Sequence, residues 1–212
     1  MDRIAFIRAN TAVSAATHVP EVRLHLADEA LPLWHKTEEK LGEEGLPPPF
    51  WAFAWAGGQA LARYLIDNPA LVAGRRVLDI GAGGGLVAIA AARSGAHSVR
   101  ANEIDAFALD AIGLNAALNE VAVEIVAGDL LGGTAEADVV LAGDIFYERP
   151  LAERALAFLH RAKADGADVL IGDPKRTYLP VDALRIAATY EVAVPRALED
   201  SDVKLTRVWR LA

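Results

Sequence analysis

Residues 77–85 read V-L-D-I-G-A-G-G-G, and Glu103 follows the first of these glycines after 22 residues. An apolar strand runs into a glycine cluster, a helix-forming run follows over residues 86–93, and a second short strand ends at Glu103. Glycines let the backbone turn tightly and approach a ligand where a side chain would collide. The carboxylate of Glu103 can accept hydrogen bonds from both hydroxyls of a ribose. This order of elements predicts a nucleotide pocket.

The spacing of the glycines distinguishes between cofactors. A dinucleotide fingerprint, G-x-G-x-x-G, requires glycine at position 86, where this chain has leucine. The pattern present is G-x-G-x-G preceded by Asp79, a form typical of S-adenosylmethionine (AdoMet) methyltransferases. An NAD-binding site and a purely structural turn are the alternatives. We predict AdoMet as the cofactor.

Composition restricts the function classes. The net charge of −8 argues against a nucleic-acid partner and suits a basic substrate, such as a lysine on a protein; a contribution to solubility alone is the alternative. The chain has no cysteine, and its five histidines never fall at metal-ligand spacing, so we expect no disulfide, no thiol nucleophile and no metal. No stretch approaches the roughly 18 apolar residues of a membrane helix. We therefore expect a cytoplasmic protein without membrane contact.

Strand and helix patterns alternate through the middle of the chain. Such alternation predicts a parallel, doubly wound sheet with right-handed crossovers. Residues 189–194 and 203–211 are strand-like and joined by a short polar link, which predicts a terminal antiparallel hairpin. We predict an α/β, Rossmann-like fold, with a seven-stranded, mostly parallel sheet, helices on both faces and an antiparallel C-terminal hairpin. The expected strands lie near 76–80, 98–103, 123–126, 138–143 and 167–172, and the expected helices near 59–67, 86–94, 106–118 and 150–162.

Residues 1–48 are predicted to form an N-terminal extension, and residues 49–212 a methyltransferase domain. The expected elements of the extension are a helix near 3–10, a strand over 22–26 and a helix over 28–41. Residues 42–49 contain three successive prolines, which exclude a helix and impose extended backbone.

Six motifs in order carry a family resemblance. The chain resembles the seven-β-strand protein methyltransferases, and most closely the lysine methyltransferases that act on the β-subunit of electron transfer flavoprotein. Two departures, Ala56 where the family has proline and Ala82 where serine is common, remove no charge that the chemistry needs. The motifs are P-F-W-A-F-A-W-A-G-G-Q-A-L-A-R-Y-L from Pro49, V-L-D-I-G-A-G-G-G from Val77, A-N-E-I-D from Ala101, L-N-A-A-L-N from Leu114, G-D-I-F-Y from Gly143 and L-I-G-D-P from Leu170.

Local chemistry and the resemblance together predict the cofactor contacts. The glycine loop and Asp79 are expected to hold the amino-acid end of AdoMet, and Glu103 its ribose hydroxyls. Ile104 is expected to lie against the adenine. Asp129 is expected to accept from the adenine amine, with a loop acid or a helix cap as the alternative. The loop residues concerned are Gly81, Gly83 and Gly85.

Aromatic residues are concentrated just before the methyltransferase core, in F-W-A-F-A-W at residues 50–55. The resemblance suggests Trp55 as a lid over the cofactor, and its place beside Gly57 and Gly58 permits close backbone approach. A place in the hydrophobic core is the alternative for Trp55. Trp51 and Phe53 are predicted to be core residues.

Asp144 ends the fourth core strand, and Tyr147 follows it in D-I-F-Y. Ligands of open α/β sheets bind beyond the carboxyl ends of the strands, which places Asp144 beside the reacting sulfonium. The motif differs from the N-P-P-Y and D-P-P-Y forms that hold planar amides and amines, and it suits a flexible basic acceptor. We predict that Asp144 positions the acceptor amine and that Tyr147 lines its channel. A helix N-cap preceding Pro150 is the alternative for Asp144.

The resemblance implies AdoMet-dependent methylation of lysine side chains of a protein substrate, namely the electron transfer flavoprotein β-subunit. A ribosomal-protein or small-molecule N-methyltransferase on the same scaffold is the nearest alternative. An NAD-binding oxidoreductase is disfavoured by Leu86 and by the terminal hairpin. A binding module with a degenerate pocket is disfavoured by the presence of Asp79, Glu103 and Asp144.

Overall fold

A computed structural model describes residues 2–27, 48–194 and 201–212 of the chain. Its centre is a seven-stranded sheet in the order β5-β4-β3-β6-β7-β9-β8. Neighbouring strands from β5 to β7 are parallel, whereas β9 runs antiparallel to both β7 and β8. The predicted sheet and C-terminal hairpin are confirmed. The strands are β3 (Arg76–Ile80), β4 (Ser98–Glu103), β5 (Glu124–Ala127), β6 (Val139–Gly143), β7 (Asp168–Asp173), β8 (Leu184–Ala193) and β9 (Val203–Leu211).

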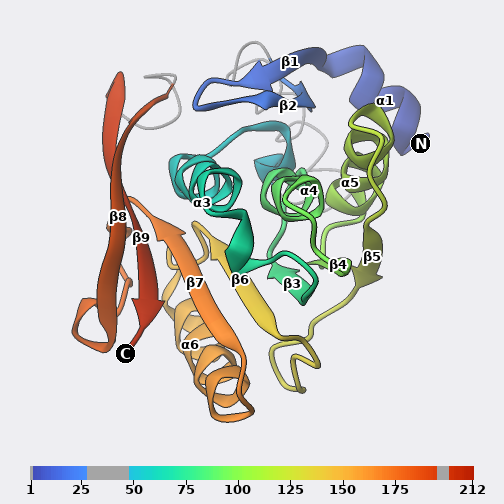
Figure 1. Cartoon of the computed structure of the whole chain (residues 1–212). Coiled ribbons are helices and arrows are strands. Elements are labelled where there is room, and N and C mark those ends of the chain that lie inside the picture. The colour runs from blue at the N-terminus through green and yellow to red at the C-terminus, as the bar shows by residue number, and fades with distance from the viewer. Residues whose placement is uncertain (1, 28–47, 195–200) are drawn as a thin grey trace.

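Helices cover both faces of this sheet (Figure 1). The face that carries α3 and α4 also receives Ile112 of α5, and α6 packs on the opposite face. Short 3-10 helices span Phe50–Ala52, Pro69–Leu71 and Val181–Ala183. The helices on the sheet are α3 (Ala56–Asp67), α4 (Leu86–Arg93), α5 (Ala106–Leu118) and α6 (Arg149–Ala164).

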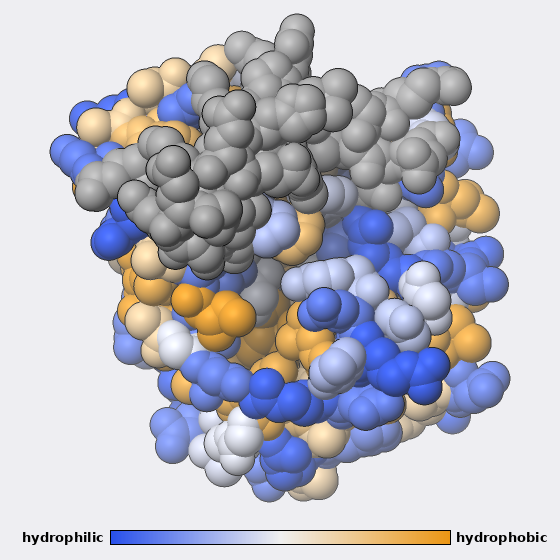
Figure 2. All heavy atoms as spheres, turned by 180° about the vertical axis from the view of Figure 1, so that it is seen from behind, coloured by the Kyte–Doolittle hydropathy of each residue, from blue (hydrophilic) through white to orange (hydrophobic). Residues whose placement is uncertain are grey.

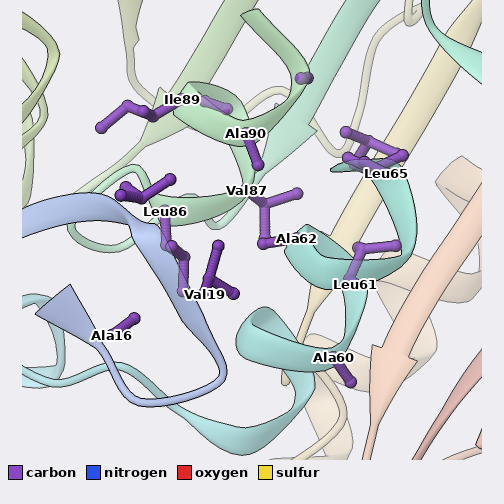
Figure 3. Close-up of a cluster of buried hydrophobic side chains, with 14 of the residues drawn as sticks. Ala16, Val19, Ala60, Leu61, Ala62, Leu65, Leu86, Val87, Ile89 and Ala90 are labelled. Atoms are coloured by element: carbon purple, nitrogen blue, oxygen red, sulfur yellow. The ribbon is translucent and has the colours of Figure 1, made fainter. Parts of the chain in front are cut away.

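The hydrophobic periodicity of the helices explains how they pack. Small and aliphatic side chains of α3 and α4 face one another and the sheet, and side chains from the first 24 residues join them in one buried cluster (Figure 3). Among the side chains labelled there are Val19 from the N-terminal part of the chain, Ala62 of α3, and Leu86 and Val87 of α4. The other face has its own core, in which Phe158 and Leu159 of α6 cover the inner strands.

Residues 2–27 fold onto the sheet and its helices. They comprise α1 (Arg3–Asn10) and an antiparallel hairpin of β1 (Ala12–Ala16) and β2 (Val19–Leu26). The backbone amide of Arg23 donates to the side chain of Asn119, the C-cap residue of α5, at 3.0 Å, and that of His25 donates to the side chain of Asn115 on α5 at 2.8 Å. The boundary predicted at residue 48 stays a prediction, and the helix predicted over 28–41 lies outside the described residues.

One strand was not predicted, and several boundaries differ from the sequence prediction, among them the start of β2 at Val19 rather than at Val22. Strand β1 is mostly exposed and has little apolar alternation, so the pattern gave no signal for it. Strand β8 begins five residues earlier than predicted, because a register shift between Ile186 and Ala188 interrupts its alternation. Helix α3 begins at Ala56 rather than near residue 59, because Gly57 and Gly58 form its first turn instead of a loop.

The back of the molecule carries many hydrophilic residues, with smaller groups of hydrophobic ones among them (Figure 2). Within residues 2–27, 48–194 and 201–212, every helix is too short or too polar to cross a bilayer.

Candidate active site

The predicted site residues gather at one edge of the sheet, where the parallel strands end. The glycine loop follows β3, Ile104 follows β4, Asp144 follows β6, and Asp173 is the last residue of β7. Because β3 lies between β4 and β6, and β7 lies beside β6, these residues lie along the same edge of the sheet although they are far apart in sequence.

The backbone of the glycine loop has positive φ angles, which residues with a side chain adopt only with strain. Gly81, Gly83 and Gly85 have φ angles of 61°, 54° and 86°, in the left-handed region. A Cβ on Gly84 would lie 2.7 Å from the carbonyl oxygen of Trp51, whereas one on Gly83 would meet no atom within 4 Å. The loop is thus closed on the Trp51 side and open at Gly83, where a ligand can approach the main chain.

Asn115 of α5 ties this loop to the N-terminal hairpin. Its Nδ2 donates to the carbonyl oxygen of Gly84 at 2.8 Å, while its Oδ1 accepts from the amide of His25 at 2.8 Å. The side chain is completely buried, so both bonds are shielded from water. The L-N-A-A-L-N motif therefore has a structural role in holding the glycine loop, which the sequence alone did not reveal.

Asp79 is buried under the loop with one unpaired oxygen. Its Oδ2 accepts from the amide of Ala88 at 3.0 Å, and its Oδ1 has no hydrogen-bond partner. Burial, and to a smaller degree the negative charge of Glu103, raises the pKa of the Asp79 carboxyl to about 8. A buried carboxylate oxygen without a partner fits a ligand that supplies an ammonium group.

Glu103 closes the loop from the neighbouring strand. Its Oε1 accepts from the amide of Gly83 at 2.9 Å, and its Oε2 accepts from the amide of Ile104 at 2.9 Å. Burial raises the pKa of this carboxyl, although these amides oppose the shift. Each carboxylate oxygen can accept more than one hydrogen bond, so a vicinal diol can be added here. Ile104 is 76% exposed and offers an apolar surface beside that position.

Asp129 lies next to this region but is bound to other groups. Its Oδ2 accepts from Arg154 of α6 at 2.5 Å, and its Oδ1 from the amide of Leu131 at 3.0 Å. The hydrogen bond from Arg154 lowers the pKa of the Asp129 carboxyl. The preceding residue, Gly128, donates its amide to the carbonyl oxygen of Glu103 at 2.9 Å, which places the loop beside β4. The contact of Asp129 with an adenine stays a prediction.

Asp144 connects three parts of the fold. Its Oδ2 accepts from the amide of Gly58 at 2.8 Å, and its Oδ1 accepts from Nε and Nη2 of Arg176 at 2.9 and 2.7 Å. Its φ of 54° is unusual for a residue with a side chain, and such strain is concentrated at functional sites. Helix α6 begins at Arg149, its N-cap residue is Glu148, and no side chain caps it. The alternative of an N-cap role for Asp144 is therefore wrong.

Glycines bring the start of α3 close enough to reach Asp144. A Cβ on Gly57 would lie 2.2 Å from the carbonyl oxygen of Gly172, and one on Gly172 would lie 2.1 Å from that of Gly57. On Gly143 a Cβ would lie 3.1 Å from the Cα of Gly58. The helix therefore packs directly on the ends of β6 and β7, and the amide of Gly58 in its first turn reaches Asp144.

Aromatic rings border the site on the side of α3. The ring centroid of Phe50 lies 5.9 Å from that of Trp55 and 5.5 Å from that of Tyr147. The indole Nε1–H of Trp55 also donates to the carbonyl oxygen of Phe50 at 2.9 Å. Tyr147 is 44% exposed, and burial together with Glu148 and Glu103 raises its pKa. The lid role of Trp55 and the channel role of Tyr147 stay predictions.

Trp51 and Phe53 belong to the core, as predicted. Both are buried, and Trp51 stacks on Phe107 of α5 with centroids 6.1 Å apart.

Arg176 is a site residue that the sequence reasoning missed. Its guanidinium pairs with Asp144 and lies 5.3 Å from the ring centroid of Trp55, so it joins the acid to the aromatic border. The available signal was the charged group D-P-K-R at residues 173–176, which begins at the last residue of β7.

No three His, Cys, Asp or Glu side chains within the described ranges are grouped so that they could hold a metal ion. The absence of a metal from the working protein stays a prediction.

Comparison with known proteins gives consistent results. The family model for ribosomal protein L11 methyltransferase (PrmA) matches residues 60–170. The electron transfer flavoprotein beta subunit lysine methyltransferase of Danio rerio is 38% identical over 97% of this chain and 81% of its own length. The protein of the same name from Xenopus laevis is 41% identical over 81% of this chain and 70% of its own length.

Among solved structures, the ribosomal protein L11 methylase of Lactobacillus delbrueckii subsp. bulgaricus superposes with a TM-score of 0.51 and 24% identity. The superposition covers 80% of this chain and 83% of that one, which supports the assignment of the fold.

Proposed function

Because this chain belongs to the family of electron transfer flavoprotein beta subunit lysine methyltransferases, we propose that it methylates lysine side chains of the electron transfer flavoprotein β-subunit. The chain is an AdoMet-dependent protein-lysine methyltransferase, and the resemblance seen in its motifs is confirmed. The observation that carries the choice of substrate is the match over 97% of the chain to enzymes whose name states both the reaction and the substrate.

The L11 methyltransferase alternative has weaker support. The matching family model ends at residue 170 and begins at residue 60, so it covers the methyltransferase core alone. The flavoprotein-specific relatives match on both sides of that core. The relatives that match over 97% of the chain carry the name of a protein-lysine methyltransferase, which favours that function over an oxidoreductase or a small-molecule methyltransferase. The net charge of −8 continues to favour a protein substrate over a nucleic acid, and the cytoplasmic location stays a prediction.

The residues at the sheet edge fit the cofactor. The unpaired Oδ1 of Asp79 suits its ammonium group, the open backbone at Gly83 leaves room for its amino-acid end, and Glu103 suits a ribose diol. When bound, AdoMet supplies an electrophilic methyl group on a sulfonium centre. Ile104 offers an exposed apolar side chain to the adenine, and Trp55, in contact with Arg176 at the same edge of the sheet, is the proposed lid.

The acceptor amine must be neutral to attack. A lysine has a pKa near 10.4, so presenting it neutral at pH 7 costs about 4 to 5 kcal/mol. Asp144 is held by Gly58 and Arg176, so its carboxylate has a fixed orientation from which to position the amine. Tyr147 lines the approach, and the amine proton leaves to solvent before attack. In this scheme Asp144 acts by positioning rather than as a base.

A methylation assay tests the proposal. The protein is incubated with labelled AdoMet and either the purified flavoprotein β-subunit or ribosomal protein L11, and labelled lysines are identified by mass spectrometry. We expect label on lysines of the β-subunit. An exclusive preference for L11 would refute the proposed substrate.

The same assay tests Asp144. We expect Asp144→Ala to bind S-adenosylhomocysteine but to lose roughly 100-fold or more in kcat, as removal of a positioning contact does. The matched control is Asp165→Ala, since Asp165 is exposed at the C-terminal end of α6. Activity of Asp144→Ala close to that of the control would show that Asp144 has no part in the reaction.

A further inference from the structure

Two carboxyl groups and one guanidinium meet where β6 and β7 end. Arg176 reaches Asp144 through Nε and Nη2, and its own backbone amide donates to Oδ1 of Asp173 at 2.6 Å. The side chains of Arg176 and Asp144 are 19% and 10% exposed, and Asp173 is completely buried. Water therefore screens this group weakly, and its charges act strongly on whatever binds beside it.

The backbone directs Arg176 toward Asp144. Lys175 has a φ of 73°, in the left-handed region, and the Asp173 carboxylate bonds the Arg176 amide three residues further on, as in a tight turn. The guanidinium then lies between the ring of Trp55 and the carboxylate of Asp144. The left-handed backbone of Lys175, the bond between Asp173 and the Arg176 amide, and the cation–π contact with Trp55 together hold the Arg176 side chain in this position.

An unpaired Asp144 would work against the proposed reaction. An anion beside a lysine amine favours the ammonium form, and only the neutral amine can attack the methyl group. A guanidinium 2.7 Å from the same carboxylate contributes the opposite field at the amine. The pair can thus orient an amine through the carboxylate while exerting little net charge on it.

We infer that Arg176 is a positioning residue that holds Asp144 and offsets its charge, so that Asp144 orients the substrate amine without keeping it protonated. This inference rests on the proposed lysine methylation, and it explains why a lysine methyltransferase can place a carboxylate beside its acceptor.

Other titratable groups near Asp144 could also change the pH dependence of the reaction, so their contribution must be distinguished from that of Arg176. In the described part of the chain, Asp173 faces it from β7, and α3 presents the backbone amide of Gly58. Burial, and then the charge of Asp144, raises the pKa of Asp173 to about 7. The pKa of Tyr147 is raised by burial and then by the charges of Glu148 and Glu103. The variant Asp173→Asn keeps an acceptor for the Arg176 amide and removes the titration of this carboxyl.

The test is the pH profile of kcat for lysine methylation between pH 6.5 and 9.5, because the acidic limb reports ionisations in the enzyme–substrate complex. For Arg176→Gln we expect the limb to move up by about one pH unit, with kcat about tenfold lower at pH 7 and recovering at high pH. Arg176→Lys should restore the wild-type limb. Asp173→Asn is the reference for the contribution of Asp173.

A second variant gives the opposite sign and does not depend on the folding of Arg176→Gln. Asp144→Asn leaves the guanidinium without its counter-charge, so the limb should move to lower pH even though kcat falls. An equal loss of kcat at every pH in Arg176→Gln, or a limb of Asp144→Asn that stays in place, would overturn the inference. A lower KM of Arg176→Gln with an unchanged pH profile of kcat would mean that Arg176 obstructs substrate binding, and this result would also overturn the inference.

Failure of the proposed function has a different signature. If the wild-type protein labels no lysine of the β-subunit, that function is refuted, and the role of Arg176 falls with it. If the wild type labels the β-subunit and the variants keep its pH profile, the role of Arg176 alone is refuted.

Discussion

Replacing Asp79 by asparagine is expected to strengthen the fold at alkaline pH and to weaken cofactor binding. In the structure Oδ2 of Asp79 accepts from the Ala88 amide, while Oδ1 has no partner. Asparagine keeps an oxygen for that amide and carries no charge to bury. The variant therefore removes the cost of a buried ionisable group and, with it, the partner for the ammonium of the cofactor.

The size of the effect follows from the pKa of Asp79, which is raised from 3.8 to about 8. Between these values the unfolded chain is ionised and the folded chain holds the proton, so the stability of the wild type falls as pH rises. One pKa unit corresponds to about 1.4 kcal/mol. The gain in Asp79→Asn should thus grow from about 1 to 2 kcal/mol at pH 5 to roughly 5 kcal/mol at pH 8.5.

Thermal unfolding measured at pH 5, 7 and 8.5 tests this prediction. For a chain of this size 1 kcal/mol corresponds to about 2 to 4 °C, so the melting temperature should rise by about 10 °C or more at pH 8.5. Asp173 has a raised pKa of the same sign, but it is present in both proteins and cancels in their difference. Asp165→Asn, at an exposed position, is the control and should melt like the wild type.

Calorimetric titration with S-adenosylhomocysteine provides the second measurement. Loss of a charge-assisted hydrogen bond should weaken binding about 10- to 100-fold. The reasoning fails if Asp79→Asn melts at or below the wild-type temperature at pH 8.5, since the carboxyl would then not be destabilising. It also fails if the variant binds S-adenosylhomocysteine as tightly as the wild type.

Two further substitutions test the geometry of the site. Glu103→Gln keeps an acceptor for the Gly83 amide, so we expect a small change in melting temperature but about tenfold weaker binding of S-adenosylhomocysteine by calorimetry; undiminished binding would remove Glu103 from the cofactor site. Gly172→Ala places a Cβ 2.1 Å from the carbonyl oxygen of Gly57 and should cost about 3 kcal/mol or more in urea unfolding. Its control is Gly132→Ala, where a Cβ meets no atom within 4 Å, and equal stabilities of the two variants would contradict the close packing of α3.

Prediction from sequence succeeded where the signal is local. The glycine loop and the alternation of strands and helices depend on residues that are neighbours in the chain, and their positions agree with the structure to within a few residues. It was less successful for β1 and for the start of β8, because an exposed strand and a bulged strand both lack a clean apolar period. The burial of Asp79 could not be predicted from the sequence either, because the atoms that cover a side chain come from several elements.

The sequence by itself determined the glycine loop, Glu103 at the end of β4, and the family. Backbone freedom, hydrophobic period and the order of motifs all depend on residues that are close together in the chain. Only the tertiary structure decided what Asp144 is bound to. Gly58 and Arg176 lie 86 and 32 residues from it in sequence, and they meet it because the glycines at 57 and 172 let α3 pack directly on the strand ends. Contacts of that kind follow from how closely elements pack, a property that no single segment contains.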